Sequence, residues 1–357
     1  KEISARFKVP QQNFNDWDDA FEFLSKCVAK GEWVVLLDEI SWLGGSDKLF
    51  PMKLKSAWDV KFKRNSKLIL VLCGSVSAWI ENNILESANF LGRVSLALNV
   101  KELSLAEISE FFKSNNYHYG QLELLTLLAI TGGVPKYLEE LVKTKPSDEA
   151  IARLCFHPSG ILFRDFKSIF KDIFRRKSMS YEKIIRLCLM EKPTPKQLAQ
   201  KLKIDHNSDL TEALHVLELS GFLERDFVFD PTNGRVKKAS RLRVKDNYTR
   251  FYLKIIEPLS VNVLKGGKKF QNLSDLKNLS AIRGYQFENI ILANKDLVHK
   301  KLNIKDHQLV SSAPYFQVKN TNTPQGCQVD LLIHIDLDVF FVCEFKAEYE
   351  VTKDVVK

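Results

Sequence analysis

Two places in the chain put acidic residues at the end of an apolar run, an arrangement typical of metal-dependent hydrolases. The first is WVVLLDEISW, in which Asp38 and Glu39 follow four apolar residues. Carboxylates at the end of a buried strand are costly unless a cation meets them, and in nucleotide hydrolysis that cation is Mg²⁺. Asp38 would hold the metal, directly or through water, and Glu39 would orient the attacking water. The alternative is a strand that exits into an acidic, N-capping turn.

The second place lies near the C-terminal end. The sequence predicts strands over Val329 to Ile335 and Val339 to Phe345, joined by a tight turn. Asp330 lies near the start of the first strand, and Glu344 and Lys346 lie two apart at the end of the second, on one face. Acids on neighbouring strands can share Mg²⁺ while a lysine positions or activates water beside a phosphodiester. An amphipathic hairpin with a surface acid and lysine is the alternative.

The first acid pair needs a sheet to position it. Residues 14–29 have the spacing of an amphipathic helix, and the short apolar run from Trp33 is typical of a parallel strand buried on both faces. Leu68 to Cys73 predicts a second such strand, followed by Gly74 and Ser75. Since ligands of open parallel sheets bind at the carboxyl ends of the strands, Ser75 either senses a γ-phosphate or caps the next helix.

A third strand is predicted over Val94 to Val100, with Arg93 directly before it. Arg93 is either a surface charge or a finger that reaches a phosphate. Ser104 and Glu107 form the capping-box pattern of a helix over 105–112. Helical patterns continue over 121–141 and 147–174.

Residues 181–258 predict three helices followed by a strand pair, the order of a winged helix. The predicted hairpin carries a basic series that would contact DNA phosphates: Arg235, Lys237, Lys238, Arg241 and Arg243. The third helix contains Asp209, Glu212 and Glu218 and suits DNA poorly, so a packing or regulatory domain is the alternative. Residues 264–279 are polar and predict a linker. A helix is expected from Ala281, and its Glu288 side chain points away from an otherwise apolar face.

Composition limits the functional classes. The 357 residues suggest two or more domains, and 45% hydrophobic residues supply a sizeable core. The net charge of +9 favours an anionic partner such as nucleic acid, although a solvated basic surface also explains it. The six scattered cysteines form no CxxC motif and indicate a reduced, cytoplasmic protein, and the histidines lack zinc-ligand spacing. No segment suits a membrane span.

Four phrases occur in an informative order: LLDEISW, LCGSVSAWI, FLGRVSLAL with ELSLAEISEFF, and TGGVPKYLEEL. Together they resemble the archaeal-type ATPase family, P-loop ATPases close to the AAA+ and STAND proteins. The resemblance implies an ATP- and Mg²⁺-dependent enzyme. It places Asp38 and Glu39 at Walker B, Ser75 at sensor 1, Arg93 at the family's GR, and Gly132, Gly133 and Pro135 at the GGxP element of a helical lid.

The C-terminal pattern resembles PD-(D/E)XK nucleases, a class of domain that the same ATPase family often carries. The resemblance implies motif positions at Asp330, Glu344 and Lys346 and a helical acid at Glu288, although no proline precedes Asp330. The chain stops about ten residues after Lys346, so the last helix of such a fold is expected to be missing. The sequence also has no GxxxxGK[ST], and we expect the chain to begin after the P-loop.

The sequence therefore predicts an α/β protein with an ATPase core (1–115), a helical lid (116–177), a winged helix (178–260), a linker (261–280) and a nuclease-like domain (281–357). ATP switching would act on DNA binding or cleavage, with Asp38, Asp330 and Glu344 as metal ligands. Arg93 hints at a homo-oligomer, because such fingers usually act across subunits. Two alternatives are an ATP-dependent regulatory or assembly protein with an inactive nuclease-like domain that binds DNA or protein, and a DNA-binding module without nucleotide.

Overall fold

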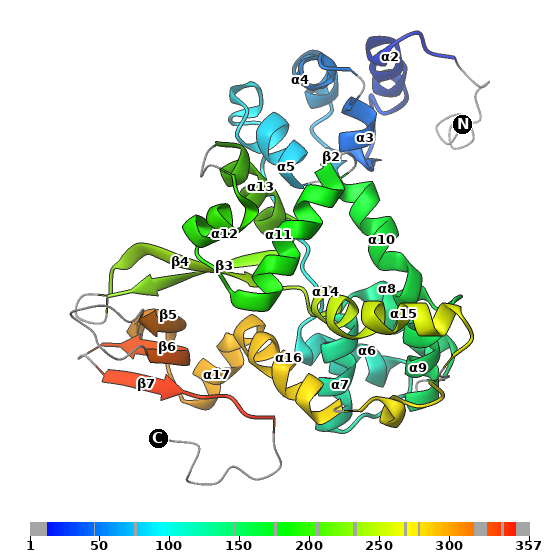
Figure 1. The fold of residues 1–357 in the computed structure, drawn as a ribbon. Coiled ribbons are helices and arrows are strands. Elements are labelled where there is room, and N and C mark those ends of the chain that lie inside the picture. Colours follow the sequence, from blue (N-terminus) through cyan, green and yellow to red (C-terminus); the bar gives the residue numbers. More distant parts are fainter. Residues whose placement is uncertain are drawn as a thin grey trace. The chain divides into compact units, whose positions relative to one another are not determined.

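The computed structural model describes residues 13–45, 47–74, 77–145, 147–174, 177–204, 208–230, 234–267, 270–277, 279–317, 327–336 and 339–347. The chain divides into two compact units, one up to residue 99 and one from residue 100 onward. The fold is α/β, as predicted, and its elements appear in Figure 1. No helix in the described part has the length and apolar character needed to cross a bilayer.

The first unit is built on two parallel strands, β1 (Trp33–Leu37) and β2 (Leu68–Leu72), paired from Trp33 with Leu68 to Leu37 with Leu72. Helices α2 (Trp17–Cys27) and α4 (Phe50–Val60) contribute Phe21, Phe50 and Leu54 to its core. Asp16 caps α2, as the sequence indicates. The smaller elements are α3 (Ile40–Gly44), η1 (Phe62–Arg64), α5 (Ser77–Ile80), η2 (Glu81–Leu85) and η3 (Ala88–Phe90).

Two predictions for this unit are wrong. Strand β1 is not buried on both faces, because Val34 and Leu36 are 68% and 56% exposed while their neighbours Val35 and Leu37 pack against the core. Residues 94–100 form no strand. They pair with no other strand of the described chain, and their apolar side chains are open to solvent. An apolar pattern gives a strand only where a neighbour supplies hydrogen-bond partners.

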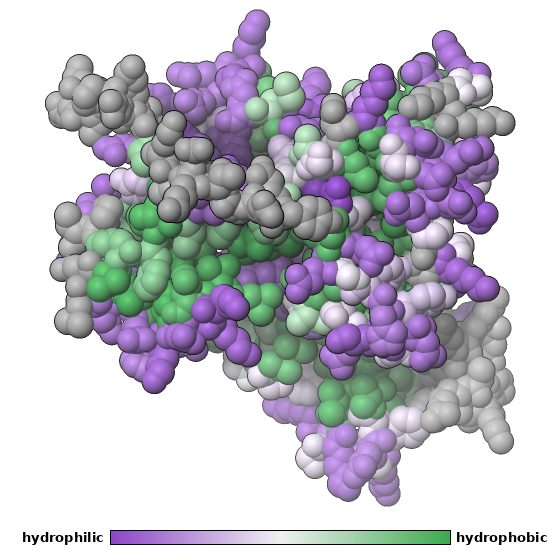
Figure 2. Space-filling model, turned by 90° about the horizontal axis from the view of Figure 1, so that it is seen from below, coloured by the Kyte–Doolittle hydropathy of each residue, from purple (hydrophilic) through white to green (hydrophobic). Residues whose placement is uncertain are grey.

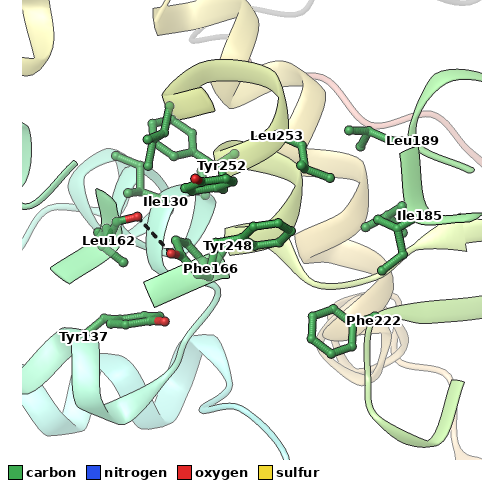
Figure 3. Packing of buried hydrophobic residues seen from close by; sticks show 14 of the residues in the cluster. Ile130, Tyr137, Leu162, Phe166, Ile185, Leu189, Phe222, Tyr248, Tyr252 and Leu253 are labelled. Carbon is green, nitrogen blue, oxygen red and sulfur yellow. Dashed lines mark hydrogen bonds between the residues drawn. The ribbon is translucent and has the colours of Figure 1, made fainter. Parts of the chain in front are cut away.

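The second unit has a continuous core built largely from helices. It begins with α6 (Leu105–Ser114), α7 (Gln121–Thr131), α8 (Pro135–Lys143), α9 (Asp148–Phe156) and α10 (Ile161–Phe174). The capping box of Ser104 and Glu107 is present. In Figure 3, Phe166 and Tyr252 stack with ring centroids 4.3 Å apart, and the Tyr248 hydroxyl donates to the Leu162 carbonyl oxygen at 2.8 Å. The predicted end of the ATPase core at residue 115 falls inside this unit, because α6 packs against α7.

Three helices and an antiparallel hairpin follow, in the predicted order. They are α11 (Ser178–Glu191), α12 (Pro195–Leu202), α13 (Ser208–Leu219), β3 (Leu223–Phe229) and β4 (Val236–Val244). We call them the helix–hairpin segment. Thr194 caps α12, and Pro195 lies in its first turn.

Residues 261–280 are not a free linker. Helix α14 (Asn247–Phe251), the π-helical turn η5 (Tyr252–Ile256) and α15 (Glu257–Leu264) precede η6 (Leu273–Asp275). Leu273 and Leu276 are buried, and Phe270 packs on Phe156 of α9 with ring centroids 4.6 Å apart. The segment was predicted to be a linker because most of its residues are polar, although these three apolar residues pack against the core.

The chain ends with helices α16 (Leu279–Ala293) and α17 (Lys295–Lys301), the turn η7 (Asp306–Gln308) and a three-stranded antiparallel sheet. The sheet order is β5 (Leu309–Gln317), β6 (Cys327–Ile335) and β7 (Val339–Cys343). Strand β5 was not predicted, because Pro314 interrupts its sequence pattern. The strand accommodates this proline at a register shift between Ala313 and Tyr315. Strand β7 exposes Val339 and Val342. In Figure 2, hydrophobic residues gather on the left side of the view.

Candidate functional site

The first acid pair lies where β1 ends. The Asp38 side chain is exposed and its Oδ1 accepts a hydrogen bond of 3.0 Å from the Glu39 backbone N–H. Glu39 precedes α3 with φ 50° and ψ 46°, the left-handed conformation that costs a non-glycine residue free energy. Backbone strain of this kind is concentrated at functional sites. The turn therefore directs two adjacent carboxylates to the edge at which β1 stops.

Strand β2 ends beside this turn. The Ile40 N–H donates to the Cys73 carbonyl oxygen at 2.8 Å, and the Cys73 N–H donates to that of Leu37 at 3.0 Å. Burial, together with hydrogen bonding to Asp38 and the charges of Asp38 and Glu39, raises the pKa of the Cys73 thiol. The structure thus brings Asp38, Glu39 and Cys73 together. Ser75, the predicted phosphate sensor, lies outside the described residues.

Arg93 has a partner within its own unit. Its guanidinium binds Asp59 of α4 in a two-pronged ion pair, with Nε 2.9 Å from Oδ1 and Nη2 2.8 Å from Oδ2. A further bond of 3.1 Å joins Nη1 to the Leu91 carbonyl oxygen. In this conformation Arg93 is held by Asp59, and its role as a phosphate-contacting finger stays a prediction.

The predicted lid element occupies the turn between α7 and α8. Gly133 has a φ of +83°, and a Cβ at this position would lie 2.6 Å from the Leu103 carbonyl oxygen. The Leu103 N–H donates to the Gly133 carbonyl oxygen at 3.0 Å. Pro135 begins α8, where it needs no hydrogen-bond donor. Both residues have clear structural roles here, and their nucleotide contact stays a prediction.

We expect Gly133→Ala to lower the free energy of unfolding by about 2–3 kcal/mol, because it adds a left-handed conformation and a backbone clash. Urea unfolding measures the change. Gly284→Ala is the matched control, since nothing lies within 4 Å of a Cβ there and no positive φ is required. If Gly133→Ala proved as stable as the control, the close approach to Leu103 would be refuted.

The second acid site lies at the open end of the β6–β7 hairpin. Leu331 pairs with Cys343. Asp330 and Glu344 are the next residues outward from this pair, one on each chain of the hairpin. Asp330 Oδ2 accepts a 2.9 Å hydrogen bond from the Phe345 N–H, and Lys346 Nζ lies 2.6 Å from Glu344 Oε1. Burial raises the pKa of Asp330, and the charges of Glu288 and Glu344 raise it further. The structure thus brings Asp330, Glu344 and Lys346 to the same end of the hairpin.

The carboxylate of Glu288 is engaged elsewhere. Lys192, directly after α11, places its ammonium 2.8 and 3.1 Å from the two Glu288 oxygens. Among the described residues, no three Asp, Glu, His or Cys side chains are grouped closely enough to hold a metal ion. The predicted ligands are therefore neighbours that do not converge in this conformation.

The raised pKa of Asp330 gives a prediction with a definite sign. The folded chain binds this proton more tightly than the unfolded chain, so stability falls as the pH rises from the ordinary Asp value of 3.8 through the folded pKa. We expect Asp330→Asn to raise the melting temperature of metal-free protein at pH 7.5. The gain should shrink as the pH falls through this window. Asp296→Asn, at a side chain 97% exposed, is the control. A loss of stability on Asp330→Asn would contradict the assignment.

The predicted basic wing divides into two groups. Arg235, Lys237 and Lys238 are exposed on the hairpin, with Lys237 Nζ 3.3 Å from Asp230. Arg241 instead lies over the Phe316 ring of β5, 4.1 Å from its centroid, and burial lowers the pKa of its guanidinium. The exposed residues stay candidates for phosphate contact.

Arg243 is not a DNA contact in this structure, and that prediction is wrong. Its side chain is 6% exposed and binds Asp226 of β3, with Nε 2.7 Å from Oδ2 and Nη2 2.9 Å from Oδ1. Its third nitrogen donates to Asn289 of α16. A guanidinium enclosed by these partners cannot reach a phosphate. Helix α16 covers the face of β4 that the sequence pattern assigns to solvent.

Sequence reasoning missed three residues that touch the candidate sites: Cys73, Asp59 and Lys192. Cys73 ends the apolar run before Gly74, so its position beside Asp38 was open to prediction. Asp59 and Lys192 are joined to their partners only by the tertiary fold. Neither has a spacing relation to Arg93 or Glu288 that a sequence pattern would reveal.

No family model and no curated protein matches the chain. Solved structures that resemble it include the Walker-type ATPase Paby2304 of Pyrococcus abyssi, with 16% identity and a TM-score of 0.49 over 71% of this chain and 75% of that one. Another is the Orc1 protein of Aeropyrum pernix in complex with DNA, with 13% identity and a TM-score of 0.32 over 71% and 73%. Values this low describe a distant likeness and assign no function.

Proposed function

We propose that the protein is an ATP-hydrolysing switch whose second unit cleaves DNA with the help of a divalent metal. The observation that carries the nucleotide site is the turn of Asp38 and Glu39, where adjacent carboxylates end one of two parallel strands in a strained conformation. Ligands of parallel sheets bind at this edge. Asp38 is exposed and offers the hard oxygen ligand that Mg²⁺ prefers. Glu39 orients the water that attacks the γ-phosphate.

The second site supports the output chemistry. The β6–β7 hairpin places Asp330 and Glu344 at the same end of two neighbouring strands, where Asp330 accepts a hydrogen bond from the Phe345 N–H. Asp330 and Glu344 would hold Mg²⁺ only after a rearrangement that brings their carboxylates together, and the ion would then supply a Lewis acid for the phosphodiester, with Glu288 as the helical acid. Lys346 holds or activates the attacking water. The exposed Arg235, Lys237 and Lys238 neutralise DNA phosphates.

A specific observation favours a second candidate, an ATP-dependent regulatory or assembly protein with an inactive nuclease-like domain. Glu344 is paired with Lys346 and Glu288 with Lys192, so two of the three predicted acids already carry a cation. A domain locked in this state would bind DNA or protein without cutting it. Contact of Arg93 with a neighbouring subunit would require its release from Asp59.

Incubation of the full-length protein with supercoiled plasmid, ATP and either Mg²⁺ or Mn²⁺ separates the two candidates. We expect nicked and linear DNA from the wild type and none from Asp330→Ala combined with Lys346→Ala. Asp336→Asn lies at the closed end of the same hairpin, away from the site. It is the control, and this variant should cleave the plasmid normally. An intact plasmid with wild-type protein would favour the inactive domain. Cleavage by the double variant would remove Asp330 and Lys346 from the reaction.

A further inference from the structure

The helix–hairpin segment lies against the C-terminal sheet at Gly234, directly before β4. Gly234 has a φ of +67°, and a Cβ at this position would lie 2.5 Å from Val310 Cγ1 of β5 and 3.8 Å from His334 Nδ1 of β6. Further along β4, Arg241 lies over the Phe316 ring of β5, 4.1 Å from its centroid. The Gly234 end of the hairpin and one face of the sheet therefore form a continuous surface (Figure 1).

This surface contains a stacked aromatic pair. His334 is paired with Phe340 of β7, and their rings stack with centroids 4.3 Å apart and planes inclined by 17°. His334 is 4% exposed, whereas Phe340 is 37% exposed. Val342, the next residue on the same face of β7, is 70% exposed. The buried histidine therefore fixes the orientation of an aromatic ring that solvent can reach.

Cations border the aromatic pair. Arg235 directly follows Gly234, Lys237 and Lys238 follow in β4, and all three are exposed. Asp230 lies 3.3 Å from Lys237 Nζ and offsets part of this charge. A reachable aromatic ring beside cations suits single-stranded nucleic acid, because the cations neutralise phosphates while the ring stacks on an unpaired base. In a duplex each base lies between its neighbours, so its faces are closed to the protein.

We infer that the Gly234 end of the hairpin and the Phe340 face of the sheet bind single-stranded DNA, with a base stacked on Phe340 and phosphates held by Arg235 and Lys238. This inference rests on the phosphate contacts of the proposed function and names the form of DNA that they serve. It requires neither metal nor ATP, because stacking and charge neutralisation supply the binding. His334 is a positioning residue, since it acts through the Phe340 ring.

Fluorescence anisotropy of the full-length protein with a labelled oligothymidine of about 16 nucleotides tests the stacking. Low salt and EDTA keep cleavage and ATP turnover out of the measurement. Phe340→Ala should weaken binding about five- to ten-fold, whereas Phe340→Trp should bind at least as tightly as the wild type, because it keeps a stacking surface. All three proteins should bind a duplex of the same length equally. Leu297→Ala, at a 45% exposed residue of α17, is the matched control and should change neither affinity.

Lys238→Ala tests the phosphate contact separately. It should weaken binding of single strand and duplex alike, and it should reduce the salt dependence of single-strand binding by about 0.7 in the slope of log Kd against log salt. Equal affinity of wild type and Phe340→Ala for oligothymidine would overturn the stacking and leave the phosphate contacts intact. A loss shared by Phe340→Trp, or one that extends to the duplex, would also overturn it. If Lys238→Ala changed neither affinity, the phosphate contact of the proposed function would fail, and this inference with it.

Discussion

Arg243→Ala is expected to lower the free energy of unfolding by about 3–5 kcal/mol, because it leaves the buried Asp226 carboxylate without its cation. The pair is bidentate and both side chains are less than 10% exposed. Arg243 also donates to Asn289, so its loss loosens α16 from the hairpin. Urea unfolding followed by circular dichroism measures the change.

Two comparisons make this result specific. Lys238→Ala, on the exposed part of the same hairpin, should change stability by less than about 0.5 kcal/mol. Arg243→Met combined with Asp226→Leu should recover much of the loss, since apolar residues of similar size often replace a buried pair without penalty. If the Arg243→Ala variant were as stable as Lys238→Ala, the buried ion pair with Asp226 would be refuted, and Arg243 would be a surface residue.

Glu39→Gln should slow ATP hydrolysis by the full-length protein by about 10²–10³-fold, because the amide cannot accept a proton from the attacking water. ATP binding should survive, since Asp38 and the backbone turn are unchanged. Single-turnover hydrolysis and nucleotide titration separate the two quantities. Glu32→Gln, at an exposed glutamate paired with Lys67 in the same unit, is the matched control. Unchanged turnover would remove Glu39 from catalysis.

Local signals in the sequence predicted local structure well. Ser104 with Glu107 begins a helix where expected, because these side chains satisfy backbone donors a few residues away. The apolar runs at Trp33 and Leu68 form parallel strands. Such signals act over a few residues and depend little on the rest of the chain.

Long-range packing accounts for the errors. The alternation of β4 places Arg241 and Arg243 opposite Leu242, which predicts a solvated basic face, yet Phe316 of β5 and Asn289 of α16 cover that face. Residues 94–100 have the composition of a strand but pair with no other strand of the described chain. The spacing of Asp330 and Glu344 on neighbouring strands could be predicted, whereas the contact of Lys192 could not, because its relation to Glu288 spans 96 positions of sequence.

We propose that nucleotide turnover in the first unit controls DNA cleavage in the second. The most direct measurement compares the rate of plasmid nicking by the full-length protein with Mg²⁺ alone and with Mg²⁺ and ATP, for wild type and Glu39→Gln. We expect ATP to change the rate for the wild type and Glu39→Gln to alter this response, while Asp330→Ala abolishes nicking under both conditions. A nicking rate that is the same with and without ATP would contradict the coupling.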